Sequence, residues 1–197
     1  FRQLAKEAGA SLVFSEAISA KGLIYQSSKT YALIRFTEKE RPIGIQFFTS
    51  NPEDTHDCIK IIEACRPDVV DLNLGCPAPK IIKKGEGGAL LRDPPRALAV
   101  IRSACKATSI PVTVKLRLLR DLPLPDFIDY LKKMEDCGIA GISLHARTVA
   151  EGFRNSARWH LLDKIAEALS VPLIASGDIK CASDVQTVLE TGCAGAM

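Results

Sequence analysis

The chain has 197 residues, enough to bury one sizeable core, and its 47% apolar and 25% charged residues are typical of a folded globular domain. No apolar run approaches the ~20 residues that span a bilayer, and the opening FRQLAKEAGA has the pattern of an amphipathic helix rather than a signal peptide, so we expect no membrane partner. The formal net charge of +3 permits a nucleic-acid partner but does not by itself indicate one.

The cysteines argue against a disulfide framework and against a metal site. There are seven of them, at positions 58, 65, 76, 105, 137, 181 and 193, and no two form a Cys-x-x-Cys pair. Disulfide scaffolds and zinc sites both need paired cysteines at regular spacing. We therefore expect reduced thiols in a cytoplasmic protein, with no bound metal.

Short β-rich apolar runs alternate with amphipathic helical segments along the chain. Most of the runs are continuous rather than alternating, as expected for parallel strands that are buried on both faces. The predicted strands cover residues 12–16, 43–48, 69–74, 112–116, 141–145 and 173–176, and a further strand begins at residue 194.

The helices between these strands carry recognisable start and stop signals. Asn51 and Asp93 each precede a proline, which combines an N-cap with a first-turn proline. Residues 121–126 hold a similar signal, Ser183 and Asp184 predict the cap of the last helix, and Gly192 predicts its end. Strands recur every ~25–40 residues, which is the size of a βα unit.

Repeated βα units are compatible with a doubly wound sheet or with a (β/α)8 TIM barrel. A doubly wound nucleotide-binding sheet usually has a Gly-x-Gly-x-x-Gly turn after an early strand, and this sequence has none. Polar residues instead recur where strands end, and in a barrel all these ends meet at one mouth. They are Glu16, Gln46, Asn73 with Cys76, Lys115 with Arg117, His145 with Arg147, and Ser176 with Asp178.

The strand count predicts an incomplete α/β TIM barrel. Only six strands and the start of another are present, and a helix precedes the first of them. We therefore expect strand 1 and most of strand 8 of the barrel to be missing, so that residues 1–197 form a partial catalytic barrel. A barrel with missing strands leaves strand edges unpaired.

Cys76 lies in the stretch DLNLGCPAPKIIKKGEGGALL, directly after a predicted buried strand. A thiol with an ordinary pKa of ~8.5 is mostly protonated at neutral pH and can donate a proton. A cysteine is more often a small buried apolar residue, and that is our interpretation of the other six. The basic, glycine-rich residues 80–88 that follow predict a flexible loop that closes over a substrate, or else an ordinary solvated loop.

Several motifs in one order resemble the dihydrouridine synthases. Residues 73–77 read NLGCP and residues 80–91 read KIIKKGEGGALL; further on come VKLR at 114–117, HART at 145–148, ARW at 157–159 and SGDI at 176–179. The resemblance covers nearly the whole chain. It implies an FMN-dependent TIM-barrel oxidoreductase that uses NADPH to reduce uridines in tRNA to 5,6-dihydrouridine.

For the cofactor, the resemblance implies five binding residues. Gln46 hydrogen-bonds the flavin ring, and Lys115 lies near its pyrimidine part. His145 approaches the ring or the phosphate tail, and the backbone at Ser176 and Gly177 helps to hold the phosphate. The corresponding structural alternatives are an end-of-strand lysine, a turn-capping glutamine and a core histidine.

For the substrate, the resemblance implies that Cys76 protonates C5 of the uracil while reduced FMN gives hydride to C6. Asn73 holds the uracil or the ring edge, unless its amide merely caps a turn. Arg117, Arg147 and Lys84 contact the nucleotide or the tRNA backbone, unless the arginines are simply solvated.

The sequence also departs from the family pattern. Ser176 stands where the family commonly has asparagine, and the family's Pro-Met-x-Gly and Gly-Arg segments at the first and eighth strands are absent. The C-terminal helical tRNA-binding domain is absent too, so we expect the chain as given to bind FMN poorly and to be inactive. Two other functions stay open: another FMN barrel, such as a dihydroorotate dehydrogenase, and a non-catalytic RNA-binding remnant.

Overall fold

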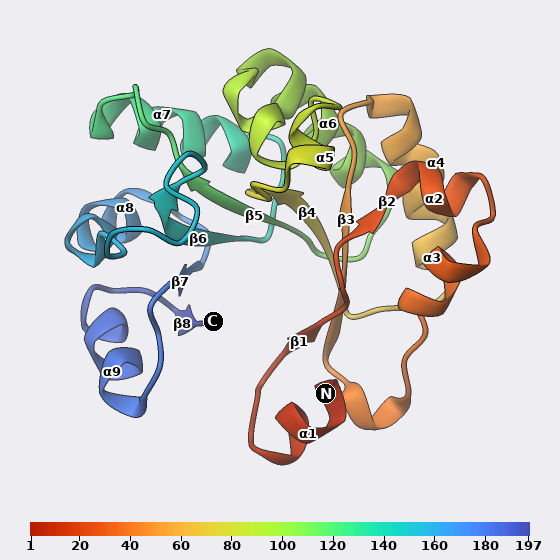
Figure 1. The fold of residues 1–197 in the computed structure, drawn as a ribbon, viewed down its shortest axis with the longest axis horizontal. Coiled ribbons are helices and arrows are strands. Elements are labelled where there is room, and N and C mark those ends of the chain that lie inside the picture. Colours follow the sequence, from red (N-terminus) through yellow and green to blue (C-terminus); the bar gives the residue numbers. More distant parts are fainter.

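The computed structural model describes residues 1–197 as one curved parallel sheet with helices along its outer side (Figure 1). The sheet order is β1-β3-β4-β5-β6-β7-β8, with β2 also paired to β3, so neighbours in the sheet are neighbours in the chain. A doubly wound sheet reverses its strand order at a switch point, and this sheet does not. The architecture is therefore that of a TIM barrel wall, as the sequence predicted.

The strands agree closely with the predicted ones. Their bounds are β1 (Val13–Phe14), β2 (Ile18–Ser19), β3 (Ile43–Phe48), β4 (Val69–Leu74), β5 (Val112–Leu118), β6 (Gly141–Thr148), β7 (Leu173–Ser176) and β8 (Gly195–Ala196). Strands β5 and β6 run two and three residues beyond the predicted ends at 116 and 145. These extra residues carry Arg117 and Arg147 into the sheet itself.

The first predicted strand, residues 12–16, is shorter than expected, because β1 covers only Val13–Phe14 and a separate segment, β2, follows at Ile18–Ser19. Both segments pair with β3, with Val13 opposite Ile43 and Ile18 opposite Phe47. Between them, the amide N–H of Gln46 donates to the side-chain Oγ of Ser15 at 3.0 Å rather than to a main-chain carbonyl. Because a side-chain hydroxyl takes the place of the main-chain acceptor, the backbone hydrogen-bond ladder to β3 is interrupted here.

The barrel is open, as expected. Segments β1 and β2 both pair with one edge of β3, and β4 pairs with its other edge. The eight strand segments therefore occupy seven strand positions in the sheet. Strand β1 and strand β8 each have a neighbour on one side only. A largely apolar cleft of about 640 Å³ lies between them, and both chain ends are on this side (Figure 1). Residues 10–14 and 194–197 line it, together with Phe1, Arg2, Ala5, Pro172 and Ile174.

The helices surround the outer side of the sheet. Their bounds are α1 (Arg2–Glu7), α2 (Ala20–Ile24), α3 (Ser28–Leu33), α4 (Pro52–Glu63), α5 (Pro79–Ile82), α6 (Pro94–Ala107), α7 (Leu124–Glu135), α8 (Leu162–Ala168) and α9 (Ala182–Glu190), with 3-10 turns η1 (Glu38–Glu40), η2 (Gly87–Arg92) and η3 (Trp159–Leu161). The side chain of Asn51 accepts from the amide of Glu53 at 2.8 Å, and that of Asp93 from the amide of Arg96 at 3.2 Å. These two predicted caps are confirmed.

The predicted cap of the last helix was wrong. Helix α9 begins at Ala182 with Cys181 as its N-cap, two residues before the predicted Ser183. Asp184 is the third helical residue, and its carboxylate reaches back to accept from the amides of Lys180 (2.7 Å) and Cys181 (3.0 Å). An acidic residue at this position completes a capping box, which places the cap three residues upstream of the acid.

The core is one cluster of 38 buried residues between the sheet and its helices. The central strands contribute fully buried side chains such as Leu72, Val114 and Leu144, as their continuous apolar runs predicted. All seven cysteines are unpaired. No helix combines the length and the apolar character that crossing a membrane requires.

Candidate active site at the strand ends

The strand register brings the predicted site residues together. Asn73 on β4 lies opposite Lys115 on β5, Arg117 lies opposite His145 on β6, and His145 lies opposite Ser176 on β7. All of them are at the carboxyl ends of parallel strands, where barrel enzymes carry their active sites. Four neighbouring strands, β4 to β7, therefore supply one polar site.

Lys115 is a largely buried cation in the floor of this site. Its Nζ donates to Ser176 Oγ at 3.2 Å and lies 3.0 Å from Met197 Sδ. Burial lowers the pKa of Lys115, and the nearby Asp71 carboxylate partly opposes that shift. An amine in this position can supply positive charge inside the barrel.

Asp71 is a site residue that the sequence analysis missed. Its side chain is 1% exposed and accepts from Gln46 Nε2 and from Thr113 Oγ1, each at 2.6 Å. Burial raises the pKa of Asp71, and the two hydrogen bonds oppose that shift. A signal existed, because a lone acid in the run VVDLNL stands two residues before Asn73 and therefore on the same face of the strand.

Asn73 holds the turn that carries the thiol. Its Oδ1 accepts from the amides of Gly75 (3.1 Å) and Cys76 (2.9 Å), while its Nδ2 donates to Gln46 Oε1 at 2.8 Å. These contacts make Asn73 a turn-capping amide. Each side-chain NH₂ of Asn73 and Gln46 still has one N–H without a protein partner, because an amide nitrogen has two.

Residues 80–88, for which we expected a loop without regular structure, contain helical turns. They form α5, a tight turn and the start of η2, and the amide of Gly88 donates to the carbonyl of Cys76 at 3.0 Å. The side chains of Lys80, Lys83 and Lys84 are exposed, whereas Gly87 is buried against the Cys76 turn. Gly87 and Gly88 therefore serve close packing, and the lysines form the exposed surface beside the turn.

Replacing Gly87 with alanine is expected to destabilise the protein. The φ of Gly87 is +57°, and a Cβ there would lie 2.9 Å from Ile81 Cγ2 and 3.1 Å from the Cβ and the carbonyl of Cys76. The left-handed backbone alone costs an alanine about 1–2 kcal/mol. Gly85→Ala is the matched control, because Gly85 has φ +72° and no atom near its Cβ position. In urea unfolding, Gly87→Ala should lose more free energy than Gly85→Ala; equal losses would contradict the packing role.

The ring of His145 packs closely against Gly177, directly after β7. A Cβ on Gly177 would lie 2.8 Å from His145 Nε2, and the φ of Gly177 is +97°, so only glycine fits here. The carbonyl of Gly177 accepts from Trp159 Nε1 at 3.0 Å. Burial first, and then Arg117, Lys115 and Arg147, lower the pKa of His145 to about 4. The imidazole is therefore neutral at physiological pH.

Arg117 is a second buried cation at the mouth, with 4% exposure. It donates to the carbonyls of Thr148 (3.3 Å) and Gly152 (2.7 Å), and burial and the neighbouring Arg147 lower its pKa. Its guanidinium lies 5.4 Å from the ring centroid of Phe153, which is 79% exposed. Phe153 was not predicted as a site residue, and the signal for it in the sequence is a single aromatic residue in a polar loop.

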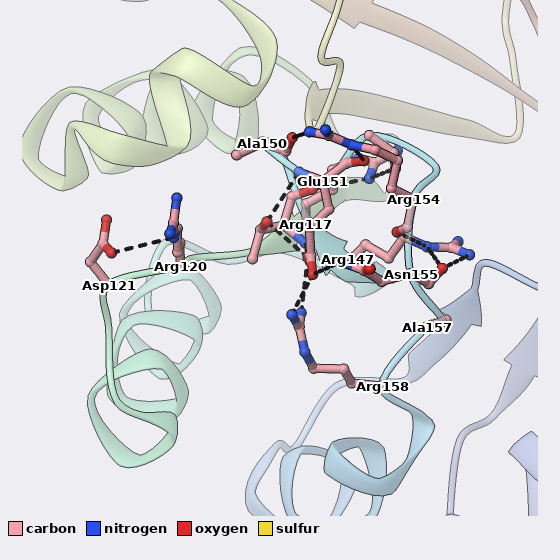
Figure 2. A network of polar contacts seen from close by, with 12 residues as sticks. Arg117, Arg120, Asp121, Arg147, Ala150, Glu151, Arg154, Asn155, Ala157 and Arg158 are labelled. Carbon is pink, nitrogen blue, oxygen red and sulfur yellow. Dashed lines mark hydrogen bonds and ion pairs between the residues drawn. The ribbon is translucent and has the colours of Figure 1, made fainter.

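Glu151 organises the loop that follows β6 (Figure 2). Its carboxylate accepts from Arg158 at 2.5 and 3.0 Å, from Asn155 Nδ2 at 3.1 Å, and from the amide and hydroxyl of Thr148 at 2.7 and 2.9 Å. The amide of Thr148 and the guanidinium of Arg158 hold the pKa of Glu151 down at about 2. The sequence analysis assigned no role to this acid.

Glu151→Gln is expected to lower the free energy of unfolding near neutral pH. Since the folded-state pKa of about 2 is below the ordinary value of about 4.3, the carboxylate stabilises the fold above that ordinary value. The stabilisation is lost as the pH falls from about 4.3 towards 2. Urea titrations across this range should therefore show the deficit of the variant shrinking. The exposed Glu167→Gln is the control, and a deficit independent of pH would contradict the interpretation.

The positive charges of Lys115 and Arg117 at the mouth can attract a ligand that is anionic or rich in hydrogen-bond acceptors. Neither Lys115 nor Arg117 forms an ion pair with a carboxylate. The neighbouring acids Glu151 and Asp178 are paired instead with Arg158 and Arg147. Together with the spare amide N–H groups, these two cations can bind a ligand that supplies oxygens or negative charge.

Comparison with solved structures confirms the fold. The chain superposes on a 2,3-dimethylmalate lyase with a TM-score of 0.66 and 13% identity, covering 99% of this chain and 70% of that one. It also superposes on a mandelate oxidase with a TM-score of 0.64 and 14% identity, covering 100% of this chain and 58% of that one. At such low identity the likeness shows the barrel architecture alone.

Comparison with known sequences is more specific. A probable tRNA-dihydrouridine synthase of Aquifex aeolicus is 36% identical over 202 residues, covering 100% of this chain and 63% of that protein. Probable tRNA-dihydrouridine synthase 1 of Synechocystis is 34% identical over 199 residues, covering 100% of this chain and 56% of that protein. The chain thus spans between 56% and 63% of the length of these relatives. A family model described as dihydrouridine synthase matches residues 1–197, so the chain belongs to the dihydrouridine synthase family.

Proposed function

We propose that this chain supplies the catalytic barrel of a tRNA-dihydrouridine synthase, which reduces uridines in tRNA to 5,6-dihydrouridine with FMN as cofactor and NADPH as reductant. The observation that carries the proposal is the half-buried Cys76, held by Asn73 in a hydrogen-bonded turn near the partly buried Lys115 and the buried Arg117, neither of which has an acidic partner. The names of the relatives point to the same reaction. Such a reaction belongs in the cytoplasm, where we place the protein.

The residues at the strand ends suit FMN. The spare N–H of Gln46 and the amine of Lys115 match the oxygens and nitrogens of a flavin ring. Ser176, Gly177 and His145 are on the adjoining strands and suit its phosphate side. When bound, FMN supplies the hydride that reduces the uracil at C6. A cation such as Lys115 near the ring stabilises the negative charge of the reduced cofactor.

The chain itself supplies the proton and holds the substrate. Cys76 donates a proton to C5 of the uracil, and the turn bonded to Asn73 positions its thiol for this step. Arg117 at the mouth and the exposed Lys84 beside the Cys76 turn contact the RNA. A base buried in folded RNA must be extruded before it can reach such a site.

The test uses the product of the complete open reading frame. The purified protein should be yellow with a flavin spectrum, and with NADPH it should convert uridine in unmodified tRNA to dihydrouridine, detected by mass spectrometry of the nucleosides. A colourless protein that binds tRNA in a salt-sensitive way would instead indicate an RNA-binding remnant. Oxidation of dihydroorotate without reduction of tRNA would indicate another FMN barrel.

A further inference from the structure

Arg147 was expected to contact the substrate, but its guanidinium is committed to the protein. The residue is 4% exposed. Its Nη2 donates to Asp178 Oδ1 at 2.5 Å and to the carbonyl of Asn155 at 2.8 Å, and its Nε lies 3.0 and 3.2 Å from the carbonyls of Asn155 and Arg154. Figure 2 shows Arg147 beside the loop that carries these carbonyls, with dashed lines marking the contacts. RNA cannot reach the donors that these contacts occupy.

One further donor of Arg147 is directed at His145. The distance between Arg147 Nη1 and His145 Nε2 is 3.1 Å. A guanidinium has five N–H donors and no acceptor, so the imidazole nitrogen must be the acceptor in this hydrogen bond. Nε2 therefore carries a lone pair, and the proton of the neutral ring resides on Nδ1.

The surroundings of His145 oppose the imidazolium form. Three cations, Lys115, Arg117 and Arg147, lower its pKa together with burial, and Asp178 is the one carboxylate that raises it. Asp178 is itself bonded to Arg147 and to the amide of Ala157 at 2.7 Å. The neutral ring is thus maintained by charge as well as by the hydrogen bond.

The position of the ring is defined by packing. Gly177 contacts its Nε2 edge so closely that no Cβ would fit there. The exposed ring of Phe153 lies edge-on at 6.1 Å between centroids. No protein atom accepts from Nδ1 of His145, so its N–H is a free donor among the convergent residues of the mouth.

We propose that Arg147, held in place by Asp178, is a positioning residue that keeps His145 in its neutral Nδ1–H tautomer and so presents one N–H donor to an acceptor atom of the bound ligand. The identity of that ligand rests on the proposed function, under which it is FMN. The tautomer and its control by Arg147 rest on the geometry alone. This role replaces the substrate contact expected for Arg147.

The tautomer can be read directly by nitrogen NMR of the protein labelled with ¹⁵N-histidine. The chain has three histidines, so the exposed His56 and His160 serve as internal references. His145 should give a protonated Nδ1 signal and an unprotonated Nε2 signal, and these should persist as the pH falls to about 5 because its pKa is about 4. A protonated Nε2 in the parent protein would overturn the proposal.

Arg147→Met and Arg154→Met form a matched pair of variants. Arg147→Met removes the donor and a cation, so His145 should populate both tautomers and its pKa should rise. Arg154 is exposed, and only its backbone carbonyl contacts Arg147, so Arg154→Met should leave the His145 signals unchanged. Unchanged His145 signals in folded Arg147→Met would overturn the proposal.

If Arg147→Met does not fold, Asp178→Asn tests whether Arg147 controls the tautomer of His145. It keeps the guanidinium but weakens its anchor, so the Nε2-protonated tautomer of His145 should become populated, although less than in Arg147→Met. The pKa of His145 should fall rather than rise, because Asp178 is the carboxylate that raises it. An unchanged tautomer in this variant would overturn the proposal. FMN titration provides a separate reading, with affinity expected to fall about tenfold in Arg147→Met. If the parent shows the Nδ1–H tautomer yet binds no FMN, the proposed function fails and the positioning role stands.

Discussion

Cys76→Ala is expected to slow uridine reduction in tRNA by about 10²–10⁴-fold, the usual contribution of a positioned general acid. The thiol is the proton donor in our proposal, and alanine leaves the turn intact because Asn73 bonds the backbone amides of Gly75 and Cys76 rather than the thiol. The flavin spectrum and the rate of flavin reduction by NADPH should therefore be unchanged. Mass spectrometry of the product nucleosides and stopped-flow absorbance measure the two rates.

The matched control for this variant is Cys181→Ser. Cys181 is the exposed N-cap of α9, a position where serine is a favoured residue, so this change should alter neither rate. Full activity in Cys76→Ala would exclude the thiol as the proton donor. Equal losses in both cysteine variants would indicate a general effect of removing thiols.

Lys115→Met is expected to weaken FMN binding and to slow uridine reduction by about 10²–10³-fold, the cost of removing one preorganised electrostatic contact. Lys115 is a partly buried cation that has no ion pair with a carboxylate, and the charge of a reduced flavin would be its natural counterpart. The variant also leaves the buried Asp71 without its nearest cation, so the pKa of Asp71 should rise further. Fluorescence titration with FMN and the tRNA assay test both effects.

Lys132→Met is the control for this charge change, because Lys132 is exposed on α7, away from the strand ends. It should leave FMN affinity and activity unaltered. If Lys115→Met binds FMN as tightly as the parent and turns over at the same rate, Lys115 is a structural lysine at a strand end. A loss of FMN binding with normal thermal stability would support the assigned role most directly.

The candidate site could be predicted only in part. Cys76 follows the end of β4, while Lys115 and His145 lie on β5 and β6, and all three carry chemistry that a sequence pattern reveals. The structure brings them to one side of the sheet through the register of these strands and the Asn73–Cys76 turn. Asp71 and Phe153 were not predicted, because each is part of the site only through contacts with residues on other strands. Arg147 was predicted to contact the substrate, because a sequence shows that a residue is charged but not whether the protein itself occupies its hydrogen-bond donors.

Local patterns in the sequence predicted the central strands, two helix caps, the open barrel and the family, because each depends on periodicity or on a motif within a few residues. The way these parts work together depends on the tertiary structure. In the fold, Asn73 and Gly87 hold the Cys76 turn, and Arg147 contacts His145 and Asp178. These contacts depend on burial and on hydrogen-bond saturation among residues brought together by the fold, which no local pattern records.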